Sequence, residues 1–553
     1  MSKRSLSPQP LPPSKRIHTS ASHHISAPAQ TFDSLLYDEL ILTIFSFLPF
    51  QDLCTIQATN RNWARLALDN QVHILPSLWK TLYREEFGRA RLRGGKGFGR
   101  EHRKDGREVR RLPGRFQLKH PGTQTDDFKE WKWMFRISRN WATGRCEISQ
   151  LHDEVPVDHL TLTPQEREIA GRTHIVLSGH YTIFASSETS PLPRVTVLNT
   201  SAQETHTLDI PGSNRPAAAR LQITALAVDQ SPPAASSRSP RLVVCLSNGE
   251  LVITTLSGPT SSYVPAARTA RVTPIVQAAY HHPLLVTLSS SFTLSAYKVA
   301  EDGFINLSHI LTSFSSFPPA SLVLTTPEPL LFKLVLTYAS PVYPQHWSIG
   351  VTEALFSTVP PSESSTYSED DIKLVSTRSS KAFDLPPSWI DEEKLRAVRE
   401  QWGRKVARVA ATQTDGRWVV LAPGRDVPAR PIPADLLPHF QRAWLFGSVP
   451  LQLYRLSFPA LPAPPKLTFV KFLYGQTSEA VGLAVADGRC VSLGANGRMW
   501  VWDLEAGGGS EVACEQWGGS GPDTLVAKGS VVFDDRRIVS ARAGSVTVSN
   551  FDV

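Results

Sequence analysis

The sequence predicts a multidomain protein of the α + all-β class, in which a short helical region precedes a long β-rich one. Apolar residues recur at helical spacing near the N-terminus, whereas short β-type runs separated by turn residues begin near residue 148. The 43 prolines and 33 glycines suit a turn-rich fold. A chain of 553 residues also exceeds one ordinary hydrophobic core. We therefore expect at least two separately packed regions.

Residues 1–30 are rich in Ser, Pro, Gln and His and have almost no large apolar side chains, which predicts a disordered tail. The basic pairs Lys3-Arg4 and Lys15-Arg16 are compatible with a short bipartite nuclear import signal and equally with a solubilising tail. The tail lacks the apolar centre of a signal peptide, and no run approaches the roughly 18 apolar residues of a membrane span. We expect a protein of the cytoplasm or nucleus that does not contact membranes.

Residues 31–83 should form three short helices. Pro49 should end the first helix, Asp52 should cap the second, and Asn60 should cap the third. So small a unit makes a poor core, and we expect it to complete its burial against a partner or the rest of the chain. The apolar residues at helical spacing are Leu36, Leu40, Ile44, Phe47 and Leu48, then Leu53 and Ile56, then Trp63, Leu66 and Ala67.

The same stretch resembles an F-box along the length of that motif. The resemblance rests on Asp38-Glu39-Leu40-x-x-x-Ile44-Phe45-Ser46-Phe47-Leu48-Pro49-x-x-Asp52-Leu53 and on Asn60-Arg61-Asn62-Trp63-x-x-Leu66-Ala67. Tyr37 stands where the family usually has proline, and Thr59 where it usually has a small apolar residue. The alternative is an ordinary amphipathic helical hairpin. The resemblance implies docking on the Skp-type adaptor of a cullin–RING ubiquitin ligase through Leu36, Leu40, Ile44, Phe47, Leu48, Pro49, Leu53, Ile56 and Trp63.

Residues 84–147 combine a basic insertion with a helical linker. Apolar spacing predicts one helix over 78–87 and another over 128–141. The first resembles the helix after the F-box in F-box proteins with C-terminal β-propellers, and Asn140-Trp141-x-x-Gly144 is similar to F-box/WD-repeat proteins. We expect the second helix to be a stiff spacer between two binding modules or a helix packed on the edge of the β-rich domain. The basic run over 84–119 could neutralise nucleic-acid phosphates, but a solvated insertion is the simpler interpretation.

From residue 148 to 553 the pattern is strand, polar turn, strand ending in an aromatic residue or Asp, then a longer loop. Its spacing, near 40 to 50 residues, is typical of the blades of a WD-repeat-like β-propeller. About 400 residues would hold seven blades. Trp502-Asp503 is the only full Trp-Asp signature, so the prediction rests mainly on the strand pattern. One or two β-sandwiches are the alternative.

Two insertions should interrupt the β-rich domain, near 357–372 and 385–410. The first contains PSESSTYSEDD, a polar and acidic run that predicts an exposed loop and a candidate phosphorylation site. The second predicts a helix that Ser388 or Asp391 caps, with apolar residues along one face. A chain beginning near Leu151 should then fold as a β domain by itself.

Catalytic motifs are missing from the sequence: there is no Gly-x-Ser-x-Gly, His-Glu-x-x-His or phosphate-binding loop. The five cysteines lie far apart, which indicates reduced thiols and neither a disulfide framework nor a zinc site. His281-His282 has no Cys, Asp or Glu at ligand spacing and fits a turn at a strand end. We expect no cofactor, no metal and no active site.

The combined prediction is a non-catalytic substrate receptor of an SCF-type ubiquitin ligase. The F-box would bind the adaptor, and the propeller would hold an unknown protein target, whose recognition could require phosphorylation. The main alternative is a basic propeller scaffold that associates with nucleic acid or chromatin, based on the basic run over 84–119 and on the basic N-terminus. A third interpretation keeps the F-box but gives the adaptor complex a structural or trafficking role.

Overall fold

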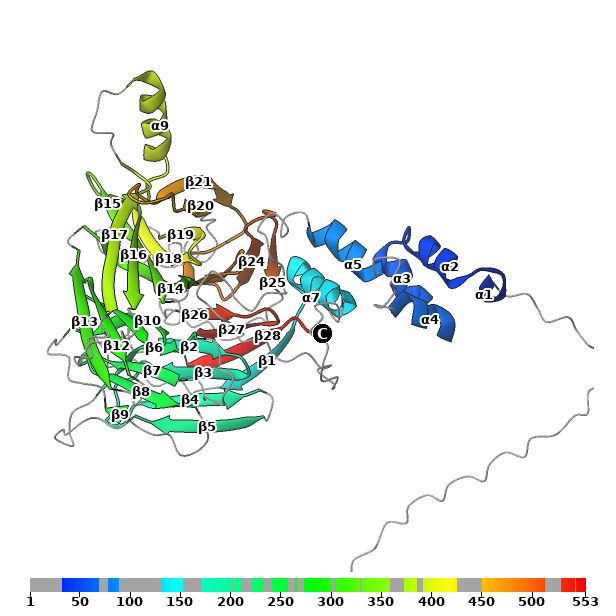
Figure 1. Cartoon of the computed structure of the whole chain (residues 1–553), viewed down its shortest axis with the longest axis horizontal. Helices are drawn as coiled ribbons and strands as arrows, with labels where there is room; N and C mark the ends of the chain where they lie inside the picture. Colours follow the sequence, from blue (N-terminus) through cyan, green and yellow to red (C-terminus); the bar gives the residue numbers. More distant parts are fainter. Residues whose placement is uncertain are drawn as a thin grey trace, which may run out of the picture. The chain divides into compact units, whose positions relative to one another are not determined.

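The computed structural model has two compact units, residues 1–82 and 83–553 (Figure 1). The residues described within them are 32–68, 78–88, 131–152, 172–200, 203–210, 221–231, 241–256, 264–265, 273–300, 304–313, 315–328, 330–358, 372–384, 391–424, 450–512, 529–542 and 544–553. The predicted disordered tail, nearly all of the basic run and the acidic loop PSESSTYSEDD lie outside these ranges.

The N-terminal unit is helical, as the sequence predicts. Its helices are α1 (Phe32–Leu35), α2 (Asp38–Phe45), α3 (Phe50–Ile56), α4 (Arg61–Leu68) and the start of α5 (Leu78–Tyr83). Asn60 caps α4 as expected, because its Oδ1 accepts a hydrogen bond from the Trp63 backbone N–H at 2.7 Å.

Two details of the predicted helix boundaries are wrong. The first helix is interrupted at Leu36 and Tyr37, and α2 ends at Phe45 rather than at Pro49. Pro49 instead occupies the N-cap position of α3, where its fixed φ and missing N–H cost nothing. Asp52 therefore lies in the first turn of α3, where its charge favours the helix dipole without capping the helix.

The second unit contains, within the described ranges, seven four-stranded antiparallel sheets, which confirms the predicted seven blades. Six blades use consecutive strands and the seventh joins β1 to the last three strands. The first three blades are β2 (Thr173–Ser178), β3 (Tyr181–Ser186), β4 (Arg194–Asn199), β5 (Glu204–Asp209); β6 (Ile223–Val228), β7 (Arg241–Leu246), β8 (Leu251–Thr255), β9 (Val264–Pro265); and β10 (Ile275–His281), β11 (Leu284–Ser289), β12 (Thr293–Val299), β13 (Ile305–Thr312).

The other blades follow the same order along the chain. They are β14 (Phe317–Glu328), β15 (Leu331–Val342), β16 (His346–Thr358), β17 (Ile372–Lys381); β18 (Arg408–Thr414), β19 (Trp418–Gly424), β20 (Leu451–Ser457), β21 (Lys466–Leu473); β22 (Ala480–Ala486), β23 (Arg489–Gly494), β24 (Met499–Asp503), β25 (Gly509–Val512); and β26 (Ser530–Phe533), β27 (Arg537–Arg542), β28 (Ser545–Asn550) with β1 (Glu147–His152).

The ring closes by pairing distant parts of the chain. β1 lies antiparallel to β28, with Glu147 opposite Asn550, and so supplies the fourth strand of the closing blade, formed by β26, β27, β28 and β1. The first strand of each blade contacts the first strand of the next, and β26 contacts β2. The first blade thus becomes a neighbour of the last, a circular arrangement that distinguishes the propeller from the sandwich alternative.

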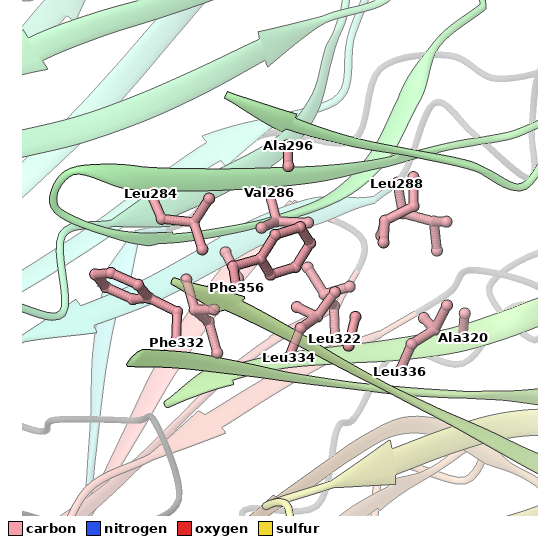
Figure 2. Close-up of a cluster of buried hydrophobic side chains, with 14 of the residues drawn as sticks. Leu284, Val286, Leu288, Ala296, Ala320, Leu322, Phe332, Leu334, Leu336 and Phe356 are labelled. Atoms are coloured by element: carbon pink, nitrogen blue, oxygen red, sulfur yellow. The ribbon is translucent and has the colours of Figure 1, made fainter. Parts of the chain in front are cut away.

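The core of this unit lies between adjacent blades. Figure 2 shows one such layer, in which Leu284, Val286 and Leu288 of β11 face the strands of the next blade. The facing residues alternate along their strands, as the period of two requires, and include Leu322, Phe332, Leu334, Leu336 and Phe356. Each blade is thus buried on both sides, which fixes its register.

Helix α9 (Glu392–Trp402) confirms a helix within the predicted range 388–409, but it ends earlier than predicted. Val406, expected on its apolar face, instead forms an antiparallel bridge with Trp347, and Val409 belongs to β18. Of the two predicted caps, Asp391 is the one used: its Oδ1 accepts a hydrogen bond from the Lys394 backbone N–H at 2.8 Å. In the described part of the chain, no helix combines the length and apolar character that crossing a bilayer requires.

Candidate protein-interaction site

The N-terminal unit has a core of its own that the predicted apolar stripe does not include. Ile41, Leu42 and Phe45 form the buried side of α2, and Leu53 of α3 and Leu66 of α4 meet them. Their spacing on α2, i, i+1 and i+4, is a helical face that the sequence could have revealed. The pattern did not single it out, because the neighbouring stripe is equally apolar.

The predicted stripe instead faces solvent. Leu40 is 50% exposed, Ile44 43% and Phe47 83%, and Leu35 just before them is 60% exposed. Leu40 and Ile44 are one helical turn apart on α2, so they form one continuous apolar surface. Several large apolar side chains exposed together on so small a unit are typical of a protein-binding surface. We call Leu35, Leu40, Ile44 and Phe47 the exposed face.

The remaining predicted adaptor contacts differ in accessibility. Pro49 is exposed, whereas Leu36, Leu48, Ile56 and Trp63 are half-buried. Leu53 has no accessible surface and belongs to the internal core, so its position does not fit the predicted contact with a partner. The structure brings the other predicted residues to the surface of one small unit.

Trp63 organises the aromatic side of the unit. Its ring makes edge contacts with Phe32 and Phe45, both at 5.7 Å between ring centroids. The Arg65 guanidinium pairs with the Asp38 carboxylate at 2.6 Å and ties α4 to the first turn of α2. These contacts hold α2 in place, and with it the exposed face.

The last segments of the unit are fixed by a buried hydrogen bond. Trp79 is 2% exposed, and its indole Nε1 donates to the Ala67 carbonyl oxygen at 2.8 Å. The bond satisfies the only polar atom of a large buried side chain and joins α5 to the end of α4.

The propeller unit begins with two short helices, and the second of them packs on the last two blades of the ring. η1 (Arg84–Gly88) and α7 (Trp131–Thr143) are joined by an ion pair between Arg139 and Glu86 at 3.0 Å and by the rings of Phe87 and Phe135. The linker helix packs on the propeller, an arrangement that is compatible with the predicted role as a stiff spacer. It belongs to the same compact unit as the blades.

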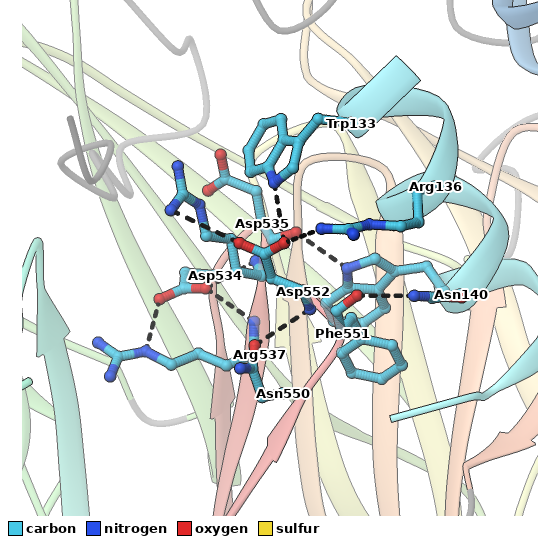
Figure 3. A network of polar contacts seen from close by, with 11 residues as sticks. Trp133, Arg136, Asn140, Asp534, Asp535, Arg537, Asn550, Phe551 and Asp552 are labelled. Carbon is cyan, nitrogen blue, oxygen red and sulfur yellow. Dashed lines mark hydrogen bonds and ion pairs between the residues drawn. The ribbon is translucent and has the colours of Figure 1, made fainter. Parts of the chain in front are cut away.

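Figure 3 shows how α7 holds the chain after β28. The Trp141 ring stacks on Phe551 at 4.0 Å, and its Nε1 donates to the Asp535 carbonyl oxygen at 2.9 Å. Asn140 Nδ2 donates to the Phe551 carbonyl oxygen at 2.9 Å. We call Trp133, Arg136, Asn140 and Trp141, together with Phe551 and Asp552, the clasp.

The Asp552 carboxylate is the acceptor of the polar contacts of Trp133 and Arg136 in the clasp. Its Oδ1 accepts hydrogen bonds from Trp133 Nε1 at 2.8 Å and from Arg136 at 2.7 Å. The resemblance pointed to Asn140 and Trp141 as an element at the start of the propeller, but sequence alone gave no partner for either side chain. That partner lies some 400 residues away, since the two hydrogen bonds of Asn140 and Trp141 span 411 and 394 positions.

Charged groups on the last blades are neutralised within the chain. Arg417 pairs with Glu505 at 3.0 Å, Arg498 with Glu511 at 3.1 Å, and Arg537 with Asp534 at 3.0 Å. Burial raises the pKa of the Asp534 carboxyl, and the Arg537 cation works in the opposite direction. Each of these three arginines therefore has a carboxylate partner within the propeller.

The two histidines singled out in the sequence lie at a strand end, as predicted: His281 is the last residue of β10, and His282 begins the turn to β11. The His282 backbone N–H donates to Asp229 Oδ1 at 3.1 Å, and the His281 ring packs against Phe332. Desolvation lowers the pKa of His281. Across the described residues, no three His, Cys, Asp or Glu side chains are grouped so that they could hold a metal ion.

Comparison with known proteins supports the F-box resemblance of the helical unit. Residues 38–85 match the family described as F-box-like. The chain is also similar to an F-box protein of Saccharomyces cerevisiae, with 29% identity over 123 residues. That match covers 22% of this chain and 18% of the yeast protein, so it spans less than a fifth of the relative's length.

Solved structures resemble the chain only loosely. BamB from Moraxella catarrhalis has a TM-score of 0.34 at 10% identity, covering 73% of this chain and all (100%) of BamB. The computationally designed Ika8 protein has a TM-score of 0.31 at 12% identity, covering 69% of this chain and 96% of Ika8. The assignment of the blades rests on the strand pairing and not on these similarities.

Proposed function

We propose that this chain, an F-box-like domain joined to a seven-bladed β-propeller, is the substrate-recognition subunit of an SCF-type cullin–RING ubiquitin ligase. The F-box-like domain binds the Skp-type adaptor and the propeller binds the protein to be ubiquitinated. The chain acts without chemistry of its own: it raises the effective concentration of the target near the ubiquitin-carrying enzyme. It works in the cytoplasm, the nucleus or both.

The observation that carries the proposal is the exposed face. Ile41, Phe45 and Leu53 form the buried core of the unit. Leu40, Ile44 and Phe47 lie outside that core and are not needed for internal packing. Burying an apolar side chain of this size is worth about 1.5–3 kcal/mol, and leaving several exposed is a cost that a partner removes. A hydrophobic patch centred on one helix is the kind of surface that supplies the energetic centre of an interface.

The adaptor interface is tested by charging the exposed face. Leu40→Asp combined with Ile44→Asp in the full chain should reduce capture of a Skp-type adaptor at least tenfold, because two carboxylates would be buried without partners. The matched control is Leu461→Asp, since Leu461 is a 54% exposed leucine of the propeller. Full adaptor binding by the double variant would show that the exposed face is not the adaptor site.

Two experiments separate the proposal from its alternatives. A reconstituted ligase should ubiquitinate the target captured from cells, and only when the propeller is present; adaptor binding without ubiquitination would favour a structural or trafficking complex. The nucleic-acid interpretation predicts instead that the full chain binds plain RNA or DNA with an affinity that falls steeply as salt rises.

A further inference from the structure

Helix α9 is an insertion that projects from the propeller. It lies in the connection from β17 to β18, and Figure 1 shows it projecting beyond the ends of these strands. Its base is fixed: Trp347 and Val406 exchange backbone hydrogen bonds of 2.7 and 2.9 Å, and the Trp402 ring lies 5.6 Å from that of Phe383. The propeller therefore presents an ordered helix at a defined place.

The helix has an apolar stripe that the described residues cover only in part, at Trp402, where Phe383 and Lys405 contact the ring. Leu395, Val398 and Trp402 follow one another at i, i+3 and i+7, the spacing of a helix–helix seam. No residue of α9 is buried, and Leu395 and Trp402 remain 38% and 39% exposed. A helix of 11 residues is marginal in water without tertiary contacts, so an exposed stripe here indicates a surface that packs against another helix.

Two charges beside the stripe form no ion pair with any residue that the structure describes. Glu392 and Arg399 each stand three residues before a stripe residue, Leu395 and Trp402, and so lie on the same side of it. Other charges on and next to the helix do form ion pairs: Lys394 pairs with Asp391, and Arg396 and Arg404 both pair with Glu400. Glu392 and Arg399 are therefore available to a helix that covers the stripe.

We propose that α9 is a self-association surface and that its occupant is the α9 helix of a second copy, packed antiparallel. In that arrangement Leu395 packs against Val398 of the second copy, and Val398 against its Leu395. The twofold symmetry then places Glu392 beside Arg399 of the second copy, and repeats the pair on the other side. The two charges thus satisfy each other across the pair of helices.

Orientation and strength follow from the same geometry. A parallel pair would bring like residues to the same height, with Glu392 near Glu392 and Arg399 near Arg399, which is repulsive. Two helices of this length bury less than the roughly 1,200 Å² of a stable interface, so the association should be weak and dependent on concentration. It would make the propeller bivalent for a target that displays repeated sites.

The test uses the purified full chain in sedimentation velocity over a wide concentration range. Wild-type protein should shift from monomer toward dimer as concentration rises. Glu392→Arg and Arg399→Glu should each weaken the dimer at least tenfold, because each creates two like-charge contacts. An equimolar mixture of the two variants should dimerise again, since only the mixed dimer restores attraction between the helices.

Matched variants keep the test specific. Arg396→Glu changes a residue that pairs within its own helix and should leave dimerisation unchanged. Leu395→Asp should abolish dimerisation, and mixing it with either charge variant should not rescue it. A wild-type chain that stays monomeric at every concentration, or charge variants that dimerise as well as wild type, would overturn the proposal and leave a helix of another protein as the occupant of this stripe.

Discussion

The N-terminal helical unit and the propeller bury their apolar residues in opposite ways. In the propeller, strands such as β11, β23 and β27 are buried along their whole length, because each blade is covered by a neighbour on both sides. In the helical unit, α2 buries one side and exposes another that is just as apolar. The propeller is complete once its ring closes, whereas the helical unit leaves an apolar surface exposed, which we propose binds the adaptor.

The comparison also separates two kinds of binding surface. The exposed face of the helical unit is apolar and small, which suits a fixed partner that buries it. The propeller is a rigid ring, and its loops can vary without loss of the core, which suits a surface for variable targets. Breaking the ring should therefore reduce the stability of the propeller, whereas a change on the exposed face should reduce the affinity for the adaptor.

A chain beginning at Leu151 should lose the closed propeller altogether. The sequence suggested that such a chain would fold, but it lacks α7 and most of β1, so the closing blade loses its fourth strand and exposes the edge of β28. We expect aggregation or a strongly lowered melting temperature in circular dichroism. A chain beginning at Tyr83 keeps both elements and is the control; equal stability of the two chains would contradict this account of closure.

Trp141→Ala should destabilise the propeller by about 3–5 kcal/mol, because it removes a large buried ring that stacks on Phe551 and donates to Asp535. Chemical unfolding of the propeller unit measures this change. Trp402→Ala provides the contrast, since that ring is 39% exposed and should cost far less. A similar loss of unfolding free energy for both variants would show that the contacts of Trp141 in the clasp do not stabilise the propeller more than an exposed ring does.

Ile41 and Leu40 are neighbours with opposite roles in the helical unit. Ile41→Ala should unfold or loosen the unit, with a loss of about 2–5 kcal/mol, because Ile41 has no exposed surface. Leu40→Ala should leave stability nearly unchanged and weaken adaptor binding instead. Thermal unfolding and adaptor affinity, measured together for both variants, decide the matter; a destabilised Leu40→Ala would place that side chain in the core.

His174 should make the propeller less stable in mild acid. Burial, assisted by the Arg172 cation, lowers its pKa to about 3, and its Nε2 lies 2.8 Å from Ser187 Oγ. Below an unfolded pKa of about 6.5, the unfolded chain therefore takes up a proton that the folded chain does not, at a cost of about 1.4 kcal/mol per pH unit down to the folded pKa.

Denaturant unfolding at pH 7 and pH 5 tests this linkage, with an expected loss of about 2 kcal/mol between the two. His174→Gln should remove most of that loss, while His206→Gln on the outer strand β5 should not alter it. A pH dependence that is the same in wild type and His174→Gln would show that other groups are responsible.

Deletion of residues 89–115 should have the smallest effect. This basic segment carries few apolar side chains, so it can contribute little buried area. We expect unchanged melting temperature and adaptor affinity, with any change confined to salt-dependent binding of an acidic target or nucleic acid. A drop of many degrees in melting temperature would show that the segment is part of the folded core.

The class of fold and the order of the domains could be predicted from the sequence. Local signals sufficed for the cap at Asn60, for two candidate caps of α9, Ser388 and Asp391, and for the change to β-type runs near residue 148, because each depends on residues close together in the chain. The propeller architecture also followed from the repeated pattern of strand and turn. The sequence did not fix the number of blades, because insertions make their spacing uneven, and the seven blades are established by the strand pairing.

Which apolar residues are internal, and where the ring closes, depends on tertiary packing. Leu40 and Ile41 are equally apolar neighbours in the sequence, and only packing against α3 and α4 makes one exposed and the other buried. Likewise β1 and β28, or Asn140 and Phe551, are paired across most of the chain. Periodicity reports the local period of an element, but the choice of partner depends on contacts between distant segments, which no local pattern contains.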